Sequence, residues 1–198
     1  DRTTGELVAP QGSIGFRWGE EGKWNLEARD GKGRDVDLEM SFIAEGAHDT
    51  VAAVAFPYFG NREHDHFEGT DHDSVLVRKV PVRTLRLAGG EEALVATVFD
   101  LFVANYGLDR GLGCANSAKS YDEMLPYTPA WAEKITGVPQ DQIVAVARAF
   151  ASNAEKTNGR SMVILGAGLN HWYHMDMNYR GIINMLVMCG CVGQSGGG

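Results

Sequence analysis

Hydrophobic and polar residues follow a β-like pattern in the first part of the chain. Residues 23–27 and 35–39 alternate polar with apolar on either side of the turn residues 30–33, which predicts a hairpin with one wet face. Residues 75–87 are rich in β-branched and apolar side chains and predict extended strands. Residues 1–91 are therefore predicted to form a β-rich subdomain.

Helical signals begin after Gly89-Gly90, where an apolar run predicts a helix from about residue 92 to residue 105. Thr128 and Pro129 are suited to the N-cap and the first position of a second helix, which Gly137 ends. Beyond Pro139 apolar residues recur at helical spacing and predict an amphipathic helix with one stripe toward a core. That stripe consists of Ile143, Val146, Ala147, Phe150, Ala151 and Ala154.

Residues 162–165 form a continuous apolar run, which is typical of a strand buried on both faces of a parallel sheet. The run ends at Gly166-Ala167-Gly168, and a helix with apolar residues on one face follows. This order predicts an α/β fold class: the β-rich subdomain over residues 1–91, then a parallel-sheet α/β portion over residues 92–198.

The glycine turn at residues 166–168 is the candidate binding site. In open α/β sheets ligands bind beyond the carboxyl ends of strands, where glycine lets backbone N–H groups approach a phosphate. His171 occupies the third glycine position of the standard dinucleotide fingerprint, so the match is partial. On the glycines alone, a tight turn that needs glycine only for steric reasons is an equally good interpretation.

The neighbouring side chains favour a ligand. Asn170 and His171 supply hydrogen-bond donors, and the indole of Trp172 can cover a ring. A second glycine-rich loop, residues 189–198, follows the helix. Two such loops flanking one helix suit a large, phosphate-containing cofactor.

Composition excludes some classes of function. The 198 residues are 44% apolar and 22% charged, and the net charge of −8 argues against non-specific nucleic-acid binding. The longest apolar stretch, residues 182–192, is shorter than the roughly 20 residues that span a bilayer, so direct membrane insertion is not expected. The N-terminus at Asp1 and the three C-terminal glycines lead us to expect an internal piece of a longer protein.

Metal-ligating side chains occur in two places. Cys114, Cys189 and Cys191 are odd in number and lack CxxC spacing, which predicts reduced thiols and neither a disulfide framework nor a zinc site. Residues 64–73, HDHFEGTDHD, could chelate a divalent ion, but a polar loop of this kind is more often a solvated turn.

Longer motifs carry a specific resemblance. These are GAGLNHWYHMDMNYRGIINMLVMCGCVGQSGGG (166–198), GSIGFRWGEEGKWNLE (12–27), FPYFG (56–60) and YTPAWAEKITGVP (127–139). Together they resemble the alpha subunit of membrane-bound respiratory nitrate reductases, in the molybdopterin oxidoreductase superfamily. The similarity extends over essentially the whole chain.

The resemblance implies an enzyme of anaerobic respiration and denitrification, which reduces nitrate to nitrite with electrons from quinol. It implies a bis(molybdopterin guanine dinucleotide) molybdenum cofactor and one [4Fe–4S] cluster. Family members work with an iron–sulfur beta subunit and a membrane haem gamma subunit, through which this subunit would lie peripherally on the cytoplasmic side of the cell membrane.

Carried over residue by residue, the resemblance implies that cofactor-binding positions gather around the glycine turn, with weaker candidates in the second loop. The expected cofactor-binding residues are Gly166, Ala167, Gly168, Asn170, His171, Trp172, Gly193 and Ser195. The family's molybdenum-ligating aspartate and cluster ligands lie outside this stretch, so no catalytic or metal-binding residue is assigned, and Asp176, Cys189 and Cys191 are left out. The chain alone is expected to be inactive.

Two alternatives remain at this point. One is a sister reductase of the same superfamily that acts on chlorate, perchlorate or selenate. The other is a stand-alone α/β nucleotide-binding module without redox chemistry, whose turn at residues 166–170 holds an ordinary nucleotide.

Overall fold

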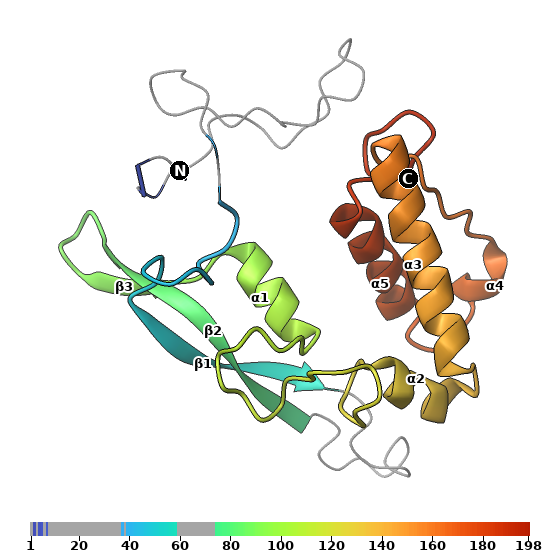
Figure 1. The fold of residues 1–198 in the computed structure, drawn as a ribbon, viewed down its shortest axis with the longest axis horizontal. Helices are drawn as coiled ribbons and strands as arrows, with labels where there is room; N and C mark the ends of the chain where they lie inside the picture. Colours follow the sequence, from blue (N-terminus) through green and yellow to red (C-terminus); the bar gives the residue numbers. More distant parts are fainter. Residues whose placement is uncertain (1, 3, 6, 8–36, 38, 59–73) are drawn as a thin grey trace. The chain divides into compact units, whose positions relative to one another are not determined.

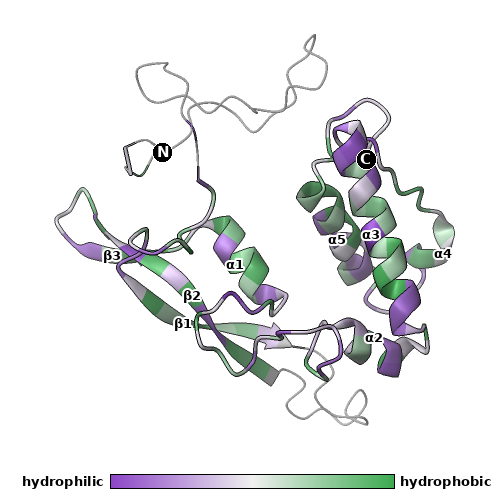
Figure 2. Ribbon diagram, viewed as in Figure 1, coloured by the Kyte–Doolittle hydropathy of each residue, from purple (hydrophilic) through white to green (hydrophobic). Residues whose placement is uncertain are grey.

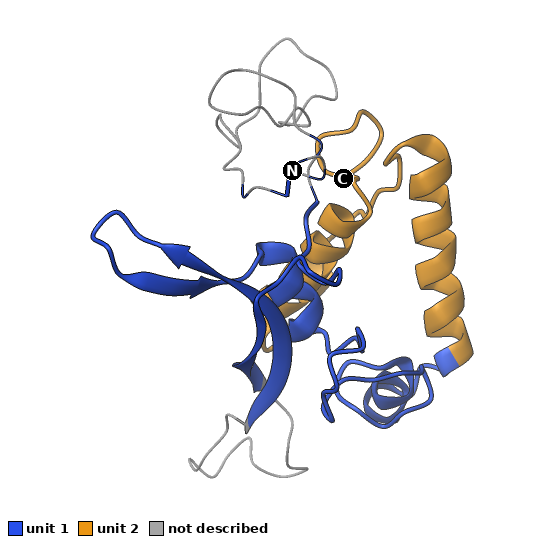
Figure 3. Cartoon of the chain, turned by 60° about the vertical axis from the view of Figure 1, so that its left-hand side comes forward, with its two compact units in different colours: residues 1–7, 37–140 blue, residues 8–36, 141–198 orange. Residues whose placement is uncertain are grey.

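A computed structural model describes residues 2, 4, 5, 7, 37, 39–58 and 74–198. The chain divides into two compact units, unit 1 with residues 1–7 and 37–140 and unit 2 with residues 8–36 and 141–198 (Figure 3). Most of the predicted hairpin over residues 23–39 lies outside the described residues, as does the histidine- and aspartate-rich loop over residues 64–73.

Unit 1 contains a three-stranded antiparallel sheet in the order β1-β2-β3 (Figure 1). The strands are β1 (Thr50–Tyr58), β2 (Ser74–Arg86) and β3 (Glu92–Val95). The extended conformation predicted for residues 75–87 is confirmed. The helix predicted from residue 92 is wrong at its start, because residues 92–95 pair with residues 83–86 of β2 instead.

The helix that follows, α1 (Val98–Asn105), starts where a side chain can cap it. The Thr97 hydroxyl accepts a hydrogen bond from the Asp100 N–H at 2.9 Å, which satisfies a donor that the first turn leaves unpaired. Ala104 of α1 packs with Phe56 of β1 and Val80 of β2 in a small core. The strand β3 and helix α1 thus belong to unit 1 together with β1 and β2, and a domain boundary at residue 91 stays a prediction.

The helix predicted between Thr128 and Gly137 is confirmed as α2 (Pro129–Thr136). Thr128 accepts from the Trp131 N–H at 3.1 Å, and Pro129 takes a position at which its missing N–H costs nothing. Gly137 ends the helix with φ 72°, in the left-handed region that glycine adopts without a steric penalty.

Unit 2 contains helices α3 (Gln140–Thr157), α4 (Ala167–Asn170) and α5 (Met175–Met188), although the first residue of α3 belongs to unit 1. Its core joins Ala154 of α3, Leu186 of α5 and Cys191. Figure 2 shows that α5 is largely apolar. Of the stripe predicted on α3, Ala154 is buried, whereas Val146 is 70% exposed.

Residues 161–165, between α3 and α4, include the buried strand predicted over residues 162–165. They form no regular strand among the described residues, and the Ile164 side chain is 88% exposed. Val163 does pack against the core of unit 2, so one side of residues 161–165 is covered by other residues of this unit. The fold is mixed α and β with a small antiparallel sheet, and the parallel sheet stays a prediction.

Among the helices of the described residues, none is both long and apolar enough to cross a membrane.

Candidate functional site

The predicted glycine turn lies where residues 161–165 lead into α4. Gly166 precedes this helix in an extended conformation, with φ −114° and ψ −176°, and no side chain caps α4. The Trp172 N–H donates to the Leu169 carbonyl at 3.2 Å, which closes the turn that follows. Ala167 and Gly168, predicted to form a turn, are instead the first residues of α4, and the predicted helix with one apolar face is α5, which begins at Met175.

The glycines of this turn are not required by the chain's own structure. A Cβ atom added at Gly166 or at Gly168 would meet no atom within 4 Å, and neither residue has a positive φ. The steric interpretation, in which the turn itself needs glycine, therefore has no support here. Open space beside two adjacent stretches of backbone instead fits a close neighbour that this chain does not contain, such as a phosphorylated cofactor.

Two other glycines of unit 2, Gly159 and Gly197, show the opposite behaviour, whereas Gly181 of α5 is as open as Gly166 and Gly168. A Cβ on Gly159 would collide with the Gly190 carbonyl oxygen, and a Cβ on Gly197 would collide with the Gly159 carbonyl oxygen. These glycines bring two backbone segments into direct contact, so internal packing explains them fully. Internal packing therefore explains Gly159 and Gly197, but it does not explain Gly166 and Gly168.

The side chains after the turn are exposed and partly organised. The Tyr179 hydroxyl of α5 donates to the Asn170 side-chain carbonyl, which ties the end of α4 to the next helix. Because Tyr179 uses the carbonyl, the amide nitrogen of Asn170 is left as the donor toward a ligand. Trp172 is 62% exposed, so its indole is available to cover a ring.

A strained residue separates α4 from α5. His174 has φ 56° and ψ 33°, a left-handed conformation that is uncommon for residues other than glycine. Its ring lies 3.9 Å from that of Tyr173, measured between centroids, and its carbonyl accepts from the Met177 N–H at 3.0 Å. Tyr173 is itself 80% exposed, so the connection presents aromatic side chains to its surroundings.

The second glycine-rich loop lies at the other end of the 161–165 segment. Gly198 is hydrogen-bonded to Ser161 and Val163, and Gly197 packs against Gly159, whereas Gly166 follows the opposite end of the segment. The structure thus gathers residues 166–172 but does not bring the loop that holds Gly193 and Ser195 to them. These two residues stay predictions without geometric support.

The two thiols of unit 2, Cys189 and Cys191, lie in this loop. Cys191 is buried and Cys189 half-buried, and both are free, as is Cys114 in unit 1. Burial, with a smaller contribution from Cys191, raises the pKa of the Cys189 thiol. In the part of the chain that the structure describes, no three His, Cys, Asp or Glu side chains gather closely enough to hold a metal ion.

Comparison with known proteins supplies the family. The molybdopterin oxidoreductase family matches residues 26–198, which is most of the chain. The chain belongs to this family. It is similar to the respiratory nitrate reductase 1 alpha chain of Escherichia coli (strain K12), with 62% identity over 99% of this chain and 16% of that protein.

Two further relatives place this molybdopterin oxidoreductase chain within its family. It is 42% identical to the nitrate reductase alpha chain of Bacillus subtilis (strain 168) over 100% of this chain and 15% of that protein. Similarity to the perchlorate reductase subunit alpha of Dechloromonas aromatica (strain RCB) is 40% but covers 38% of this chain and 8% of that protein. The chain thus spans about a sixth of the nitrate reductase chains that it matches.

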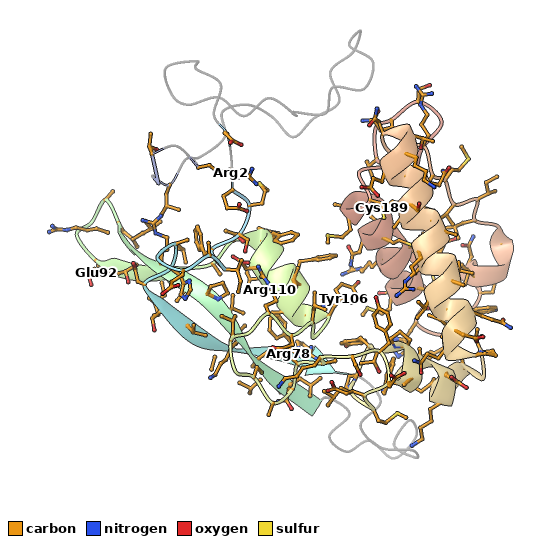
Figure 4. All side chains as sticks on the ribbon, viewed as in Figure 1. Arg2, Arg78, Glu92, Tyr106, Arg110 and Cys189 are labelled. Atoms are coloured by element: carbon orange, nitrogen blue, oxygen red, sulfur yellow. The ribbon has the colours of Figure 1, made fainter. Side chains whose placement is uncertain are left out.

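Sequence reasoning missed the buried polar residues of unit 1. Arg78 of β2 is 1% exposed and donates to the carbonyl oxygens of Asn116 at 2.9 Å and Asn105 at 2.8 Å. Asp100 is fully buried and pairs with Arg110. Figure 4 labels both arginines. Only the Thr97-x-x-Asp100 spacing, which resembles a capping box, could have signalled this network from sequence.

Proposed function

We propose that this chain is a part of a respiratory nitrate reductase alpha subunit that binds its bis(molybdopterin guanine dinucleotide) cofactor through residues 166–172. The observation that carries the proposal is that the exposed backbone at Gly166 and Gly168, where an added Cβ would meet no atom of this chain, lies beside the donors of Asn170 and His171 and the exposed indole of Trp172. Family membership names a cofactor of the right chemistry, because a molybdopterin guanine dinucleotide contains phosphates and flat ring systems.

The residues of the turn have distinct roles in this proposal. Gly166, Ala167 and Gly168 offer backbone that a phosphate can approach closely. Asn170 and His171 donate hydrogen bonds from their amide and imidazole groups, and Trp172 covers a ring. When bound, the cofactor supplies the oxygen-atom and electron chemistry, and the chain's residues bind and orient it.

We assign nitrate as the substrate of the complete subunit because the similarity to nitrate reductase chains covers 99–100% of this chain. The match to the perchlorate reductase chain is partial, which disfavours the sister oxyanion reductases. A stand-alone nucleotide-binding module is disfavoured because the relatives are about six times longer and match from end to end of this chain.

The remaining parts of the proposal concern the complete enzyme. Electrons from quinol reach the subunit through an iron–sulfur beta subunit and a membrane haem gamma subunit, which hold it peripherally on the cytoplasmic side of the membrane. The ligands of molybdenum and of the [4Fe–4S] cluster lie outside this chain. Residues 92–198 contribute to a parallel-sheet, cofactor-binding portion of the subunit.

The proposal is tested by filling the open space at the turn. In the full-length enzyme, Gly166→Ala and Gly168→Ala are expected to lower the molybdenum and guanine content of the purified protein at least several-fold. Gly89→Ala is the matched control, since Gly89 also has no positive φ and nothing within 4 Å of an added Cβ, but lies in the turn between β2 and β3. This control should leave cofactor content unchanged.

A second pair of variants separates the donors from the backbone. Asn170→Ala and His171→Ala in the full-length enzyme are expected to reduce cofactor occupancy while leaving the protein folded by circular dichroism. If all four substitutions near the turn left molybdenum and guanine at the level of Gly89→Ala, residues 166–172 would not be a cofactor site.

A further inference from the structure

Two backbone hydrogen bonds connect the C-terminal residue to the segment before the glycine turn. The Val163 N–H donates to the Gly198 carbonyl at 2.8 Å, and the Gly198 N–H donates to the Ser161 carbonyl at 3.2 Å. In parallel strands, a residue hydrogen-bonds to the residues before and after the one that lies beside it on the neighbouring strand. Gly198 bonds in this way to Ser161 and Val163, the two neighbours of Met162. Gly198 is thereby aligned beside Met162, in the same chain direction.

The segment beyond this pair has an unused backbone edge. In a parallel ladder the next groups on the same side as the Val163 N–H are the Val163 carbonyl and the Leu165 N–H. Among the described residues, neither of these groups has a hydrogen-bond partner. The segment is partly exposed in this chain, so the edge is open to a further strand that would pair with these groups.

Side-chain exposure along the segment alternates as in a strand. Val163 packs against the core of unit 2, whereas Met162 and Ile164 are 53% and 88% exposed. Ser161 is buried, and its hydroxyl donates to the Phe150 carbonyl at 3.1 Å. One side of the segment is thus already covered by α3 and α5, and the apolar residues on the other side suit a sheet that is covered on both faces.

We propose that in the complete subunit the polypeptide continuing from Gly198 forms a parallel strand along residues 161–165. The register follows from the observed pair: Met162 lies beside Gly198, and 198 − 162 = 36, so residue i pairs with residue i + 36. The second residue after Gly198 then lies beside Ile164. This inference rests on the proposed function in one respect, that the chain is part of a longer subunit.

The position of Gly198, and not only the exposed apolar side chains, indicates that the polypeptide following Gly198 forms the added strand. Gly198 already lies in register, so extension by two to four residues completes the edge without a new crossing of the chain. The connection from residue 165 to residue 198 contains α5, which gives the strand, helix, strand unit that parallel neighbours require. Gly166 then follows the carboxyl end of a sheet strand, where ligands of α/β folds bind.

Cysteine cross-linking in the full-length subunit tests the register. Cysteines at residue 164 and at the second residue after Gly198 would lie on neighbouring strands about 4.8 Å apart, with side chains on the same face. This separation is within the range that a disulfide spans. Ile164→Cys paired with the second site is expected to form a disulfide on mild oxidation, detected by peptide mass spectrometry.

The matched control moves one cysteine to the other face. Val163→Cys with the same second site places the two thiols on opposite sides of the sheet and should give less than a tenth of the cross-link. Backbone protection supplies a measurement without substitution: the Leu165 amide of the full-length subunit should exchange with deuterium at least a hundredfold more slowly than an unstructured amide.

Other outcomes overturn the inference. A cross-link through Val163→Cys and not Ile164→Cys would mean a different register, and a disulfide between two copies would mean a partner strand from another chain. A protected Leu165 amide without either cross-link would mean a strand from elsewhere in the subunit. Failure of the proposed function is distinguishable, because Gly168→Ala would then leave molybdenum content unchanged whether or not the cross-link forms.

Discussion

The guanidinium of Arg110 donates to the carboxylate of Asp100 at 2.5 Å. Asp100 lies in helix α1 of unit 1, and Arg110 lies in the loop that follows this helix. Asp100 is fully buried and also accepts from the Ser41 hydroxyl at 2.6 Å and the Phe42 N–H at 2.8 Å. Burial pushes the pKa of this carboxyl upward, but the hydrogen bonds from Phe42, Ser41, Arg110 and Thr97 together hold the pKa below its usual value.

The lowered pKa of Asp100 predicts acid sensitivity. The unfolded chain binds its proton at a higher pH than the folded chain, so the stabilisation is present above about pH 4 and is lost as pH falls through the lower folded value. Asp100→Asn should destabilise the chain by about 3–5 kcal/mol at neutral pH because the half-buried Arg110 loses the carboxylate that it pairs with. Urea unfolding of both proteins between pH 7 and pH 2 measures the difference.

The exposed pair of Arg2 and Asp37 is the control for this prediction. Their side chains are 58% and 65% exposed, so Asp37→Asn should change stability by at most about 1 kcal/mol. The interpretation of Asp100 fails if Asp100→Asn loses as much stability on acidification as the unsubstituted chain.

Gly107 and Gly111 test how closely Arg78 is packed. Both glycines have positive φ, 71° and 77°, so alanine at either position carries a conformational penalty of about 1–2 kcal/mol. An added Cβ at Gly107 would lie 2.5 Å from Nη2 of Arg78, whereas one at Gly111 meets nothing within 4 Å. Gly107→Ala should therefore cost at least about 1–3 kcal/mol more than Gly111→Ala, by thermal or urea unfolding. Equal losses would show that Arg78 can move aside.

The thiols of Cys114 and Cys189 should react differently with pH. Burial acts to raise the pKa of Cys114, but hydrogen bonds from Ser117, Asn116 and Lys79 and the charge of Arg78 lower it overall, whereas the pKa of Cys189 is raised. The thiolate attacks iodoacetamide and displaces iodide, so alkylation of Cys114 should reach half its maximum rate at a lower pH than alkylation of Cys189.

Peptide mass spectrometry after timed alkylation measures the extent of modification of Cys114 and Cys189 in the same sample. Ser117→Ala removes a hydrogen bond to the thiolate and should move the profile of Cys114 to higher pH while leaving that of Cys189 in place. Coincident profiles in the unsubstituted chain would contradict the prediction.

Gly181 lies within α5, where glycine is about 1 kcal/mol less favourable than alanine. Nothing lies within 4 Å of a Cβ added there, so Gly181→Ala should stabilise this 198-residue chain by up to about 1 kcal/mol. Gly159→Ala should do the reverse, because its Cβ would strike the Gly190 carbonyl and its φ is 88°. Thermal unfolding compares the two, and destabilisation by Gly181→Ala would mean that another segment covers this face.

Local sequence signals predicted the elements whose boundaries depend on neighbouring residues. Thr128, Pro129 and Gly137 define α2 because a cap, a proline and a left-handed glycine act within one helical turn. The helix predicted from residue 92 failed at its start for the complementary reason. Residues 92–95 are compatible with either structure, and pairing with β2, the strand directly before them, decides for a strand.

The candidate site was predictable in part. The sequence predicted a break in the chain after residue 165 and a helix further on, but residues 161–165 form no regular strand and α4 begins within the predicted turn. It could not show that Gly159 and Gly197 serve packing whereas Gly166 and Gly168 do not, since that distinction depends on which backbone segments meet. Nor could it show that the loop with Gly193 and Ser195 lies at the other end of the 161–165 segment.

The amino-acid sequence by itself determined the family and the caps of α2, because each depends on short stretches of adjacent residues. Tertiary structure alone decided that Arg110 meets Asp100, that Arg78 is buried among backbone carbonyls, and that Gly198 lies beside Met162. These contacts join residues 10 to 38 positions apart, and such pairings depend on how separate elements pack and on no signal within either one.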